Sequence, residues 1–248
     1  KALSYYHGSG RSWIRQRIRG RISRMGANEL PIEMTSLWES TAPGWDHQRL
    51  DGDADADVAI VGAGITGLAA ALRVAESGRS VIVLDTAHPG WGASGRNGGQ
   101  VIPGLKIDPD AIADRFGEGL VAFAGDTADA VFRIIRQYQI DCLANRGGWI
   151  QPAYTAATMR TLSARCAQWQ ARGAEVEMLD RHGVGDALGS QSYVGGFLDR
   201  RAGSLHPLKY TMGLGAAARG LGARVFSHAA VTAIERCGDR YALRTAAG

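Results

Sequence analysis

The feature that most constrains this chain is a strand, a glycine turn and a helix in direct succession. Asp57-Val-Ala-Ile-Val61 is a short apolar run typical of a buried parallel strand, and it leads into Gly62-Ala63-Gly64-Ile65-Thr66-Gly67. Apolar residues then recur at helical spacing from Leu68 to Ser77. The first glycine permits a tight turn, the second lets the backbone approach a pyrophosphate, and the third allows close helix–strand contact. The pattern predicts a dinucleotide-binding βαβ unit with the phosphates at the helix N-terminus.

A second strand with an acidic end completes this unit. Gly78 occupies the position expected after a helix C-terminus, and Ser80-Val-Ile-Val-Leu84 predicts a buried strand that ends at Asp85. Asp85 lies 21 residues after Gly64. A carboxylate at this point accepts hydrogen bonds from ribose hydroxyls and repels a 2′-phosphate. The complete arrangement is far more specific than a lone glycine motif, although it does not separate FAD from NAD.

The segment after Asp85 favours FAD. Five glycines lie between residues 90 and 99, interleaved with Ser94, Arg96 and Asn97, and such a segment cannot form a stable helix or strand by itself. Its amide groups, with Ser94 and Arg96, suit phosphate and ribityl oxygens, while Gly98 and Gly99 let the main chain approach a flat ring. A flexible surface loop is the alternative. The position directly after the ribose-binding strand favours a loop that wraps a ligand.

Together, Gly62 to Gly67 and Gly90-Trp-Gly-Ala-Ser94-Gly-Arg-Asn-Gly-Gly99 resemble the FAD-binding N-terminus of the D-amino-acid oxidase superfamily, most of all its amine-oxidising members. The resemblance extends from about Ser36 to the end of the chain. It implies an α/β fold, α+β as a whole, with a Rossmann-like FAD-binding domain interleaved with a partial substrate domain. The cofactor-binding residues that it implies are Gly62, Gly64, Ile65, Thr66, Gly67, Asp85, Ser94, Arg96, Asn97, Gly98, Gly99 and Val231.

The resemblance also implies an enzyme that acts on the C–N bond of an amine or amino-acid-like small molecule. A hydride passes from carbon to flavin N5, water hydrolyses the resulting imine, and O2 or an electron carrier reoxidises the flavin. A dedicated base is not obligatory, so no catalytic residue is predicted. The sequence leaves open which amine is oxidised, whether the enzyme is an oxidase or a dehydrogenase, and its oligomeric state.

The rest of the chain predicts the domain boundaries. Residues 57–106 and 200–248 are assigned to the FAD-binding domain and 107–199 to a substrate-side domain. Helices are expected from Pro109 to Tyr138, divided in two near Gly117 and Gly119, after an N-cap at Thr155, and from Pro207 to Arg219. His206 before the last of these suits a structural helix-entry role better than acid–base chemistry.

After that helix, Arg224 to Ser227 predicts a further strand of the FAD sheet, followed by a strand from Ala229 to Glu235 that carries Val231. Members of the resembling family continue well beyond this point. The chain is therefore interpreted as C-terminally truncated, with Tyr241 to Thr245 as a strand that lacks its partner. Whether it folds, binds FAD or is active in this form stays open.

The basic isoelectric point comes from the N-terminus. Seven of the 28 lysines and arginines precede Met25, where no acidic residue occurs, so the remainder carries 21 basic against 24 acidic residues. Residues 1–34 are interpreted as a basic, disordered arm, in preference to a helix that docks on a membrane or nucleic acid. Residues 35–56, with Trp38, Pro43 and Trp45, are expected to form an irregular lead-in.

Other classes of protein fit the sequence less well. Three widely spaced cysteines and six scattered histidines predict neither a disulfide framework nor a metal site, and no apolar stretch is long enough to span a bilayer. A cytoplasmic protein with no nucleic-acid partner is expected. An NAD-dependent reductase of Rossmann type, and a non-catalytic dinucleotide-binding module with a docking arm, are the alternatives.

Overall fold

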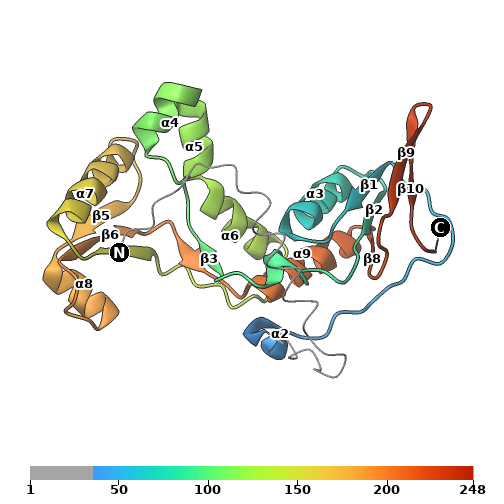
Figure 1. Ribbon diagram of the computed structural model, residues 1–248, viewed down its shortest axis with the longest axis horizontal. Coiled ribbons are helices and arrows are strands. Elements are labelled where there is room, and N and C mark those ends of the chain that lie inside the picture. Colours follow the sequence, from blue (N-terminus) through green and yellow to red (C-terminus); the bar gives the residue numbers. More distant parts are fainter. Residues whose placement is uncertain (1–35, 248) are drawn as a thin grey trace, which may run out of the picture. The chain divides into compact units, whose positions relative to one another are not determined.

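The structure, a computed structural model, describes residues 36–247 (Figure 1). The predicted basic arm, residues 1–34, lies outside the described residues. From residue 37 onward the chain forms one unit. Within it, a parallel sheet and an antiparallel sheet have separate hydrophobic cores.

The parallel sheet is the predicted dinucleotide-binding unit. It contains β1 (Val58–Val61), β2 (Val81–Leu84) and β8 (Arg224–Phe226) in the order β1-β2-β8. All pairings are parallel, with Val58 opposite Val81 and Ile82 opposite Arg224. The prediction that the chain returns to this sheet after residue 200 is thereby confirmed.

Two helices cover one face of this sheet. Helices α3 (Ile65–Glu76) and α9 (Pro207–Gly220) pack against each other (Figure 1). Leu68, Leu72 and Leu214 form a buried core with Val83 of β2 and Val225 of β8. Burial of each such aliphatic side chain stabilises the fold by about 1.5–3 kcal/mol, so this core holds the glycine turn against the sheet.

Burial differs between the two strands of the fingerprint. All four residues of β2 are buried, because Val81 and Val83 face the helices while Ile82 and Leu84 enter a second cluster on the opposite face. The expectation of a buried strand was wrong for one face of β1, where Val61 is 55% exposed. On this face of β1, neither Ala59 nor Val61 belongs to a hydrophobic cluster, whereas Val58 and Ile60 pack against the core with the helices.

The middle of the chain contains three helices where two were predicted. They are α4 (Pro109–Phe116), α5 (Glu118–Gly125) and α6 (Thr127–Gln137). The first break falls at Gly117, which has a φ of +84° that glycine adopts without strain. The second falls at Asp126, whose φ of −90° and ψ of −3° interrupt the helical path. The short side chains around this break gave no apolar pattern by which to locate it.

The antiparallel sheet has the order β4-β6-β5 and pairs β4 (Trp149–Ala153) and β5 (Val176–Leu179) with the central β6 (Gly195–Asp199). Helix α7 (Ala156–Gln170) packs on it, and the predicted N-cap is confirmed, because Thr155 Oγ1 accepts a hydrogen bond from the Thr158 N–H at 3.1 Å. Helix α8 (Arg181–Leu188), capped by Asp180, was not predicted. Its two internal glycines obscure the helical pattern.

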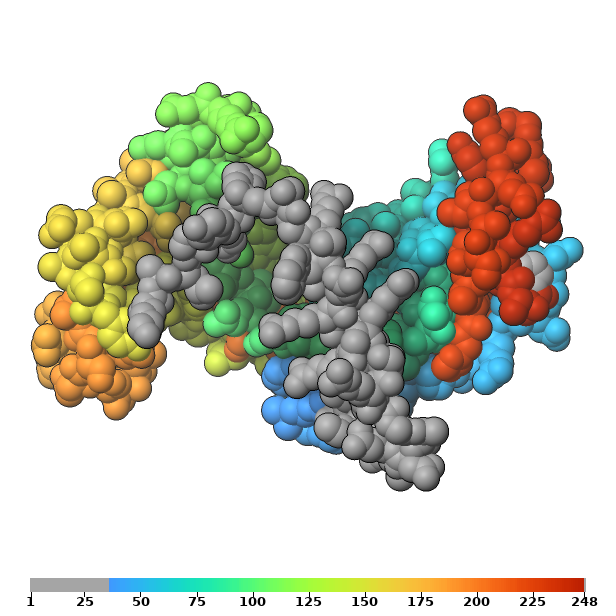
Figure 2. Space-filling model, in the orientation of Figure 1, coloured from blue at the N-terminus to red at the C-terminus, as the bar shows by residue number. Residues whose placement is uncertain are grey.

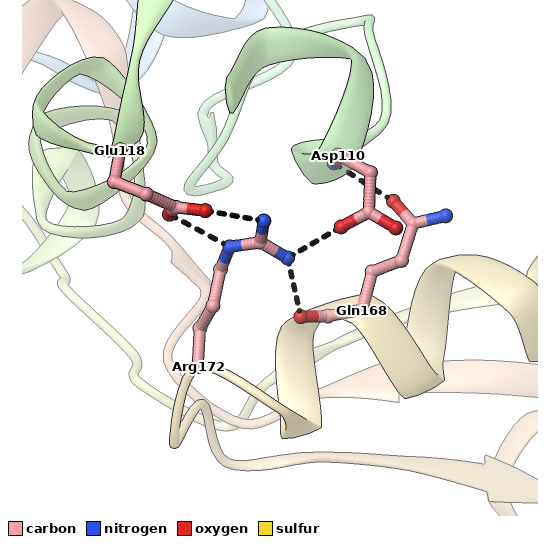
Figure 3. Close-up of polar contacts among 4 residues, drawn as sticks. All are labelled: Asp110, Glu118, Gln168 and Arg172. Atoms are coloured by element: carbon pink, nitrogen blue, oxygen red, sulfur yellow. Dashed lines mark hydrogen bonds and ion pairs between the residues drawn. The ribbon is translucent and has the colours of Figure 1, made fainter. Parts of the chain in front are cut away.

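An arginine after α7 connects this sheet layer to the middle helices (Figure 3). Arg172 makes two hydrogen bonds to Glu118 of α5, at 2.7 and 3.0 Å, and one to Asp110 of α4 at 2.7 Å. The hydrogen bonds from Arg172 lower the pKa of the Glu118 carboxyl below its usual value. Because Arg172 is always charged, this network holds α4 and α5 on α7 throughout the physiological pH range.

Two short ribbons complete the described residues. Strand β3 (Gln100–Val101) pairs with β7 (Gly203–Ser204), and β9 (Ala233–Cys237) pairs antiparallel with β10 (Arg240–Arg244). The expected strand from Ala229 to Glu235 is wrong, because β9 begins only at Ala233. The last strand was expected to lack a partner, which is also wrong, although the hairpin, red in Figure 2, leaves Ile234 and Tyr241 exposed.

Candidate cofactor-binding site

The glycine turn between β1 and α3 has the close packing that its sequence predicts. Gly62 has a φ of +102°, in the region that favours glycine. A Cβ added to Gly67 would lie 2.0 Å from the Gly62 carbonyl oxygen, so no larger residue fits there without movement of the backbone. Gly64, the N-cap of α3, supplies no capping side chain. The turn therefore leaves the start of α3 uncovered by its own residues.

Donor groups at the start of α3 are only partly satisfied. Ser94 Oγ accepts the Ile65 N–H at 3.0 Å, and Asp85 Oδ2 accepts the Ala63 N–H at 2.6 Å. Among the described residues, none accepts a hydrogen bond from the amide groups of Gly64, Thr66 and Gly67. Unpaired N–H groups at a helix N-terminus carry partial positive charge and favour an anion. This arrangement suits a phosphate group.

Asp85, predicted to accept a hydrogen bond from a ribose hydroxyl, also stabilises the fold. Its second carboxylate oxygen accepts the Ala87 N–H at 2.8 Å, so the side chain joins the glycine turn to the segment after β2. Its backbone N–H donates to Phe226 at the end of β8, and its carbonyl accepts from Ala229. Each carboxylate oxygen has a further lone pair, so acceptance of a ribose hydroxyl remains compatible with these bonds.

The loop from Gly90 to Gly99 is held by its own hydrogen bonds. It includes a short 3-10 helix, η1 (Ala93–Gly95). The Asn97 amide donates to the carbonyls of Ala93 and Ser94, both at 3.1 Å, and its side-chain oxygen accepts the Gly99 N–H at 2.8 Å. Gly99 has a φ of +69°, and its carbonyl accepts a hydrogen bond from the backbone N–H of Leu205. The Asn97 side chain therefore shapes the loop.

The other predicted residues of the loop differ in their surroundings. The Arg96 guanidinium lies 5.6 Å from the centre of the Trp91 ring, donates through Nε to the Trp91 carbonyl at 2.7 Å, and pairs with Glu39 at 3.4 Å. Gly98 is exposed, and a Cβ added to it would meet nothing within 4 Å. Of these positions, the main chain at Gly98 is the most open to a ligand.

Val231 lies apart from the start of α3. Its half-buried side chain packs in the cluster of Ile82, Leu84 and Ala229, on the face of the sheet opposite α3. It precedes β9, so it lies in an irregular segment where a strand was expected.

Three histidines that are far apart in the sequence lie close together in the structure: His88 follows β2, His228 follows β8, and His47 comes from the segment before β1. The His47 ring centre lies 5.6 Å from that of His88 and 5.3 Å from that of His228. Desolvation, and then the neighbouring His88 and His228, lower the pKa of His47. Within residues 36–247, no group of three or more potential ligands is arranged to hold a metal ion. No sequence signal indicated this cluster, because its members come from three separate segments.

The fold and the glycine turn agree with comparison to known proteins. Residues 57–248 match the DAO family, described as FAD dependent oxidoreductase. The chain belongs to this family. The family's cofactor is FAD.

A curated relative is the gamma-glutamylputrescine oxidoreductase of Escherichia coli (strain K12), 36% identical over 184 residues. The match covers 72% of this chain and 43% of that protein, so the chain spans less than half of the relative's length.

Solved structures support the fold. Glycine oxidase from Geobacillus kaustophilus superposes with a TM-score of 0.67 at 20% identity, over 78% of this chain and 52% of that one. L-amino acid deaminase from Proteus vulgaris gives a TM-score of 0.69 at 18% identity, over 82% of this chain and 47% of that one. No helix in residues 36–247 is long and apolar enough to span a membrane.

Proposed function

We propose that this chain binds FAD across the β1–α3 turn and the loop from Gly90 to Gly99, as part of an oxidoreductase that acts on the C–N bond of an amine or amino-acid-like molecule. The observation that carries the proposal is the set of three amide groups, on Gly64, Thr66 and Gly67, that have no acceptor among the described residues. They suit the pyrophosphate, and the N-cap residue, Gly64, makes no side-chain cap hydrogen bond to them.

The remaining predicted residues fit the same ligand. In the proposal Asp85 accepts a ribose hydroxyl, and Ile65 and Thr66 belong to the first turn of α3. Ser94, Arg96 and Asn97 lie along the pyrophosphate, and Gly99 lets the main chain approach the ring. Gly98 presents open main chain toward the ring, and Val231 contributes backbone on the adenine side. The domain division at residues 57–106, 107–199 and 200–248 is proposed with it.

FAD supplies the redox chemistry when bound, since its ring accepts a hydride equivalent from the substrate carbon. The part of this chain is to bind and orient the cofactor. The donors at the start of α3 would stabilise the phosphate charge. No described side chain is assigned as an acid or base.

The substrate and the electron acceptor rest on the relatives. A gamma-glutamylated diamine is named for one relative and amino acids for others, so a small amine substrate is proposed, with O2 or an electron carrier as acceptor. Cys142, Cys166 and Cys237 are free thiols, which is consistent with a reducing, cytoplasmic compartment.

The test is an absorbance spectrum of the purified chain with and without added FAD. Bound flavin is expected to give bands at about 370 and 450 nm that remain after gel filtration. Bleaching of the longer-wavelength band by an added amine then tests the reaction separately. Binding of NAD without uptake of flavin would contradict the proposal and favour a nicotinamide-dependent reductase.

A matched pair of glycine variants locates the site. In Gly64→Ala the new Cβ would lie 2.8 Å from Ser94 Oγ at the start of α3, whereas in Gly119→Ala, in α5 outside the proposed site, it would meet nothing within 4 Å. The first variant is expected to weaken FAD binding at least about tenfold, equivalent to about 1.4 kcal/mol, and the second to leave it unchanged. Equal dissociation constants for both variants would place FAD elsewhere.

A further inference from the structure

The segment expected to be an irregular lead-in is an anchored strap. It comprises residues 37–50 and begins with helix α2 (Leu37–Thr41), which lies beside α9 (Figure 1). The rest of the strap follows α9 toward the end of β8. Its contacts are made by aromatic side chains and single hydrogen bonds, which explains why no periodicity revealed it.

The first anchor is on the loop of the candidate site. Trp38 Nε1 donates a hydrogen bond to the Asn97 carbonyl at 2.9 Å. The side chain of Asn97 closes the loop on itself, so Trp38 fixes the residue that sets the shape of the loop. Its ring also packs edge-on against His206, with 4.8 Å between ring centres.

His206 connects the strap to the start of α9. Its Nδ1 accepts the Lys209 N–H at 3.2 Å, which makes it the N-cap of the helix, so Nε2 carries the proton of the neutral ring. Nε2 then donates to Thr41 Oγ1 at 3.0 Å, and Thr41 Oγ1 donates to the Leu37 carbonyl at 2.6 Å. Every polar atom in this series has a compatible partner, and His206 is only 3% exposed.

The far end of the strap is anchored independently. The Trp45 ring lies 4.2 Å from the Arg219 guanidinium and covers Gly215, where an added Cβ would approach it to 2.8 Å. The Gln48 carbonyl accepts the Ser227 N–H at 2.8 Å, just beyond β8. With this end fixed on α9 and β8, α2 is held in place against the loop.

We infer that the strap preorganises the FAD loop and that Trp38 is the positioning residue. The inference rests on the proposed function, because it concerns the shape of the loop that receives FAD. Ordering a flexible residue costs about 1–2 kcal/mol, so a loop held in its bound conformation before FAD arrives binds more tightly. Trp38 acts on the loop through its hydrogen bond to the Asn97 carbonyl.

The experiment compares three variants of the full chain. Trp38→Phe keeps an aromatic ring against His206 but removes the N–H donor, and Trp38→Ala removes both. Leu37→Ala is the matched control, since this side chain lies in the same helix and is 68% exposed. The readouts are the FAD dissociation constant, the fine structure of the bound-flavin spectrum, and tryptic cleavage after Arg96 in the absence of FAD.

Trp38→Ala is expected to raise the FAD dissociation constant about tenfold and to increase the rate of cleavage after Arg96, with Trp38→Phe intermediate and Leu37→Ala like the wild type. Wild-type cleavage rates and affinity in Trp38→Ala would overturn the inference. If the wild type binds no FAD, the proposed function fails, yet the cleavage comparison still decides whether Trp38 holds the loop.

Discussion

Substitution of Gly67 by alanine separates helix propensity from tertiary packing. Gly67 lies in the first turn of α3, where alanine by itself favours the helix by up to about 1 kcal/mol. The structure predicts the opposite sign. An added Cβ would lie 2.0 Å from the Gly62 oxygen and 3.3 Å from Ile60 Cγ2, and both atoms belong to the strand and turn that α3 packs against.

The magnitude follows from the displacement that relieves this overlap. A carbon–oxygen contact normally needs about 3.3 Å, so α3 and the turn must separate by roughly 1 Å. Overpacking of this kind costs about 1–3 kcal/mol, and the upper part of this range applies because a backbone oxygen cannot rotate away. After the gain in helix propensity, we expect a net loss of about 2 kcal/mol, or about 4–8 °C in Tm.

The assay is thermal and urea unfolding of the chain without FAD, so that cofactor affinity does not contribute. Gly119→Ala is the control, because Gly119 also lies in the first turn of a helix, α5, and an added Cβ would meet nothing within 4 Å. This variant is expected to be as stable as the wild type or up to about 1 kcal/mol more stable. A Gly67→Ala protein that matches or exceeds Gly119→Ala would refute the reasoning.

Three further outcomes follow from named contacts. Ser94→Ala removes the acceptor of the Ile65 N–H and is expected to lower stability by about 1 kcal/mol, measured by urea unfolding. His206→Asn is expected to make Tm fall less steeply as the pH is lowered below about 6.5. Burial of the ring, and then the nearby Lys209, lower the pKa of His206 in the folded state. The neutral ring therefore contributes stability that is fully present above about pH 6.5, the pKa of an unfolded histidine, and is lost as the pH falls through the lower folded-state pKa. Arg172→Met is expected to lower Tm at low salt, and the difference from wild type should shrink at about 1 M salt, where the Debye length is about 3 Å.

Each of these three measurements has a comparison or a result that would contradict it. The pKa of His47 is lowered by desolvation, His88, His228 and Arg219 and raised by Asp46, so its net effect on the pH dependence has the same sign as that of His206, and only the difference between His206→Asn and wild type isolates His206. An unchanged difference between Arg172→Met and wild type at high salt would show that packing of the arginine stem outweighs its charge. Full stability in Ser94→Ala would mean that water replaces the hydroxyl at no cost.

Sequence patterns correctly predicted those parts of the fold in which the stabilising contacts join residues close together in the sequence. The strand, turn and helix from residue 58 to 76, the N-cap at Thr155 and the strand after Gly222 all depend on side chains a few positions apart. Predictions failed where the local pattern is weak. The break at Asp126, the helix capped by Asp180 and the late start of β9 carry weak local signals, because small or polar residues dominate there.

The sequence by itself indicated the kind of ligand: the glycine spacing, Asp85 and the loop to Gly99 predict a dinucleotide site because backbone clearance and charge are local properties, and the family match gives FAD as the cofactor. Only the tertiary structure decided which remote residues contact the loop and α9. Trp38 and His206 lie 59 and 165 residues from the groups they bind, Asn97 and Thr41. Such contacts form when α9 returns beside α3, and a pattern in the linear sequence does not record them.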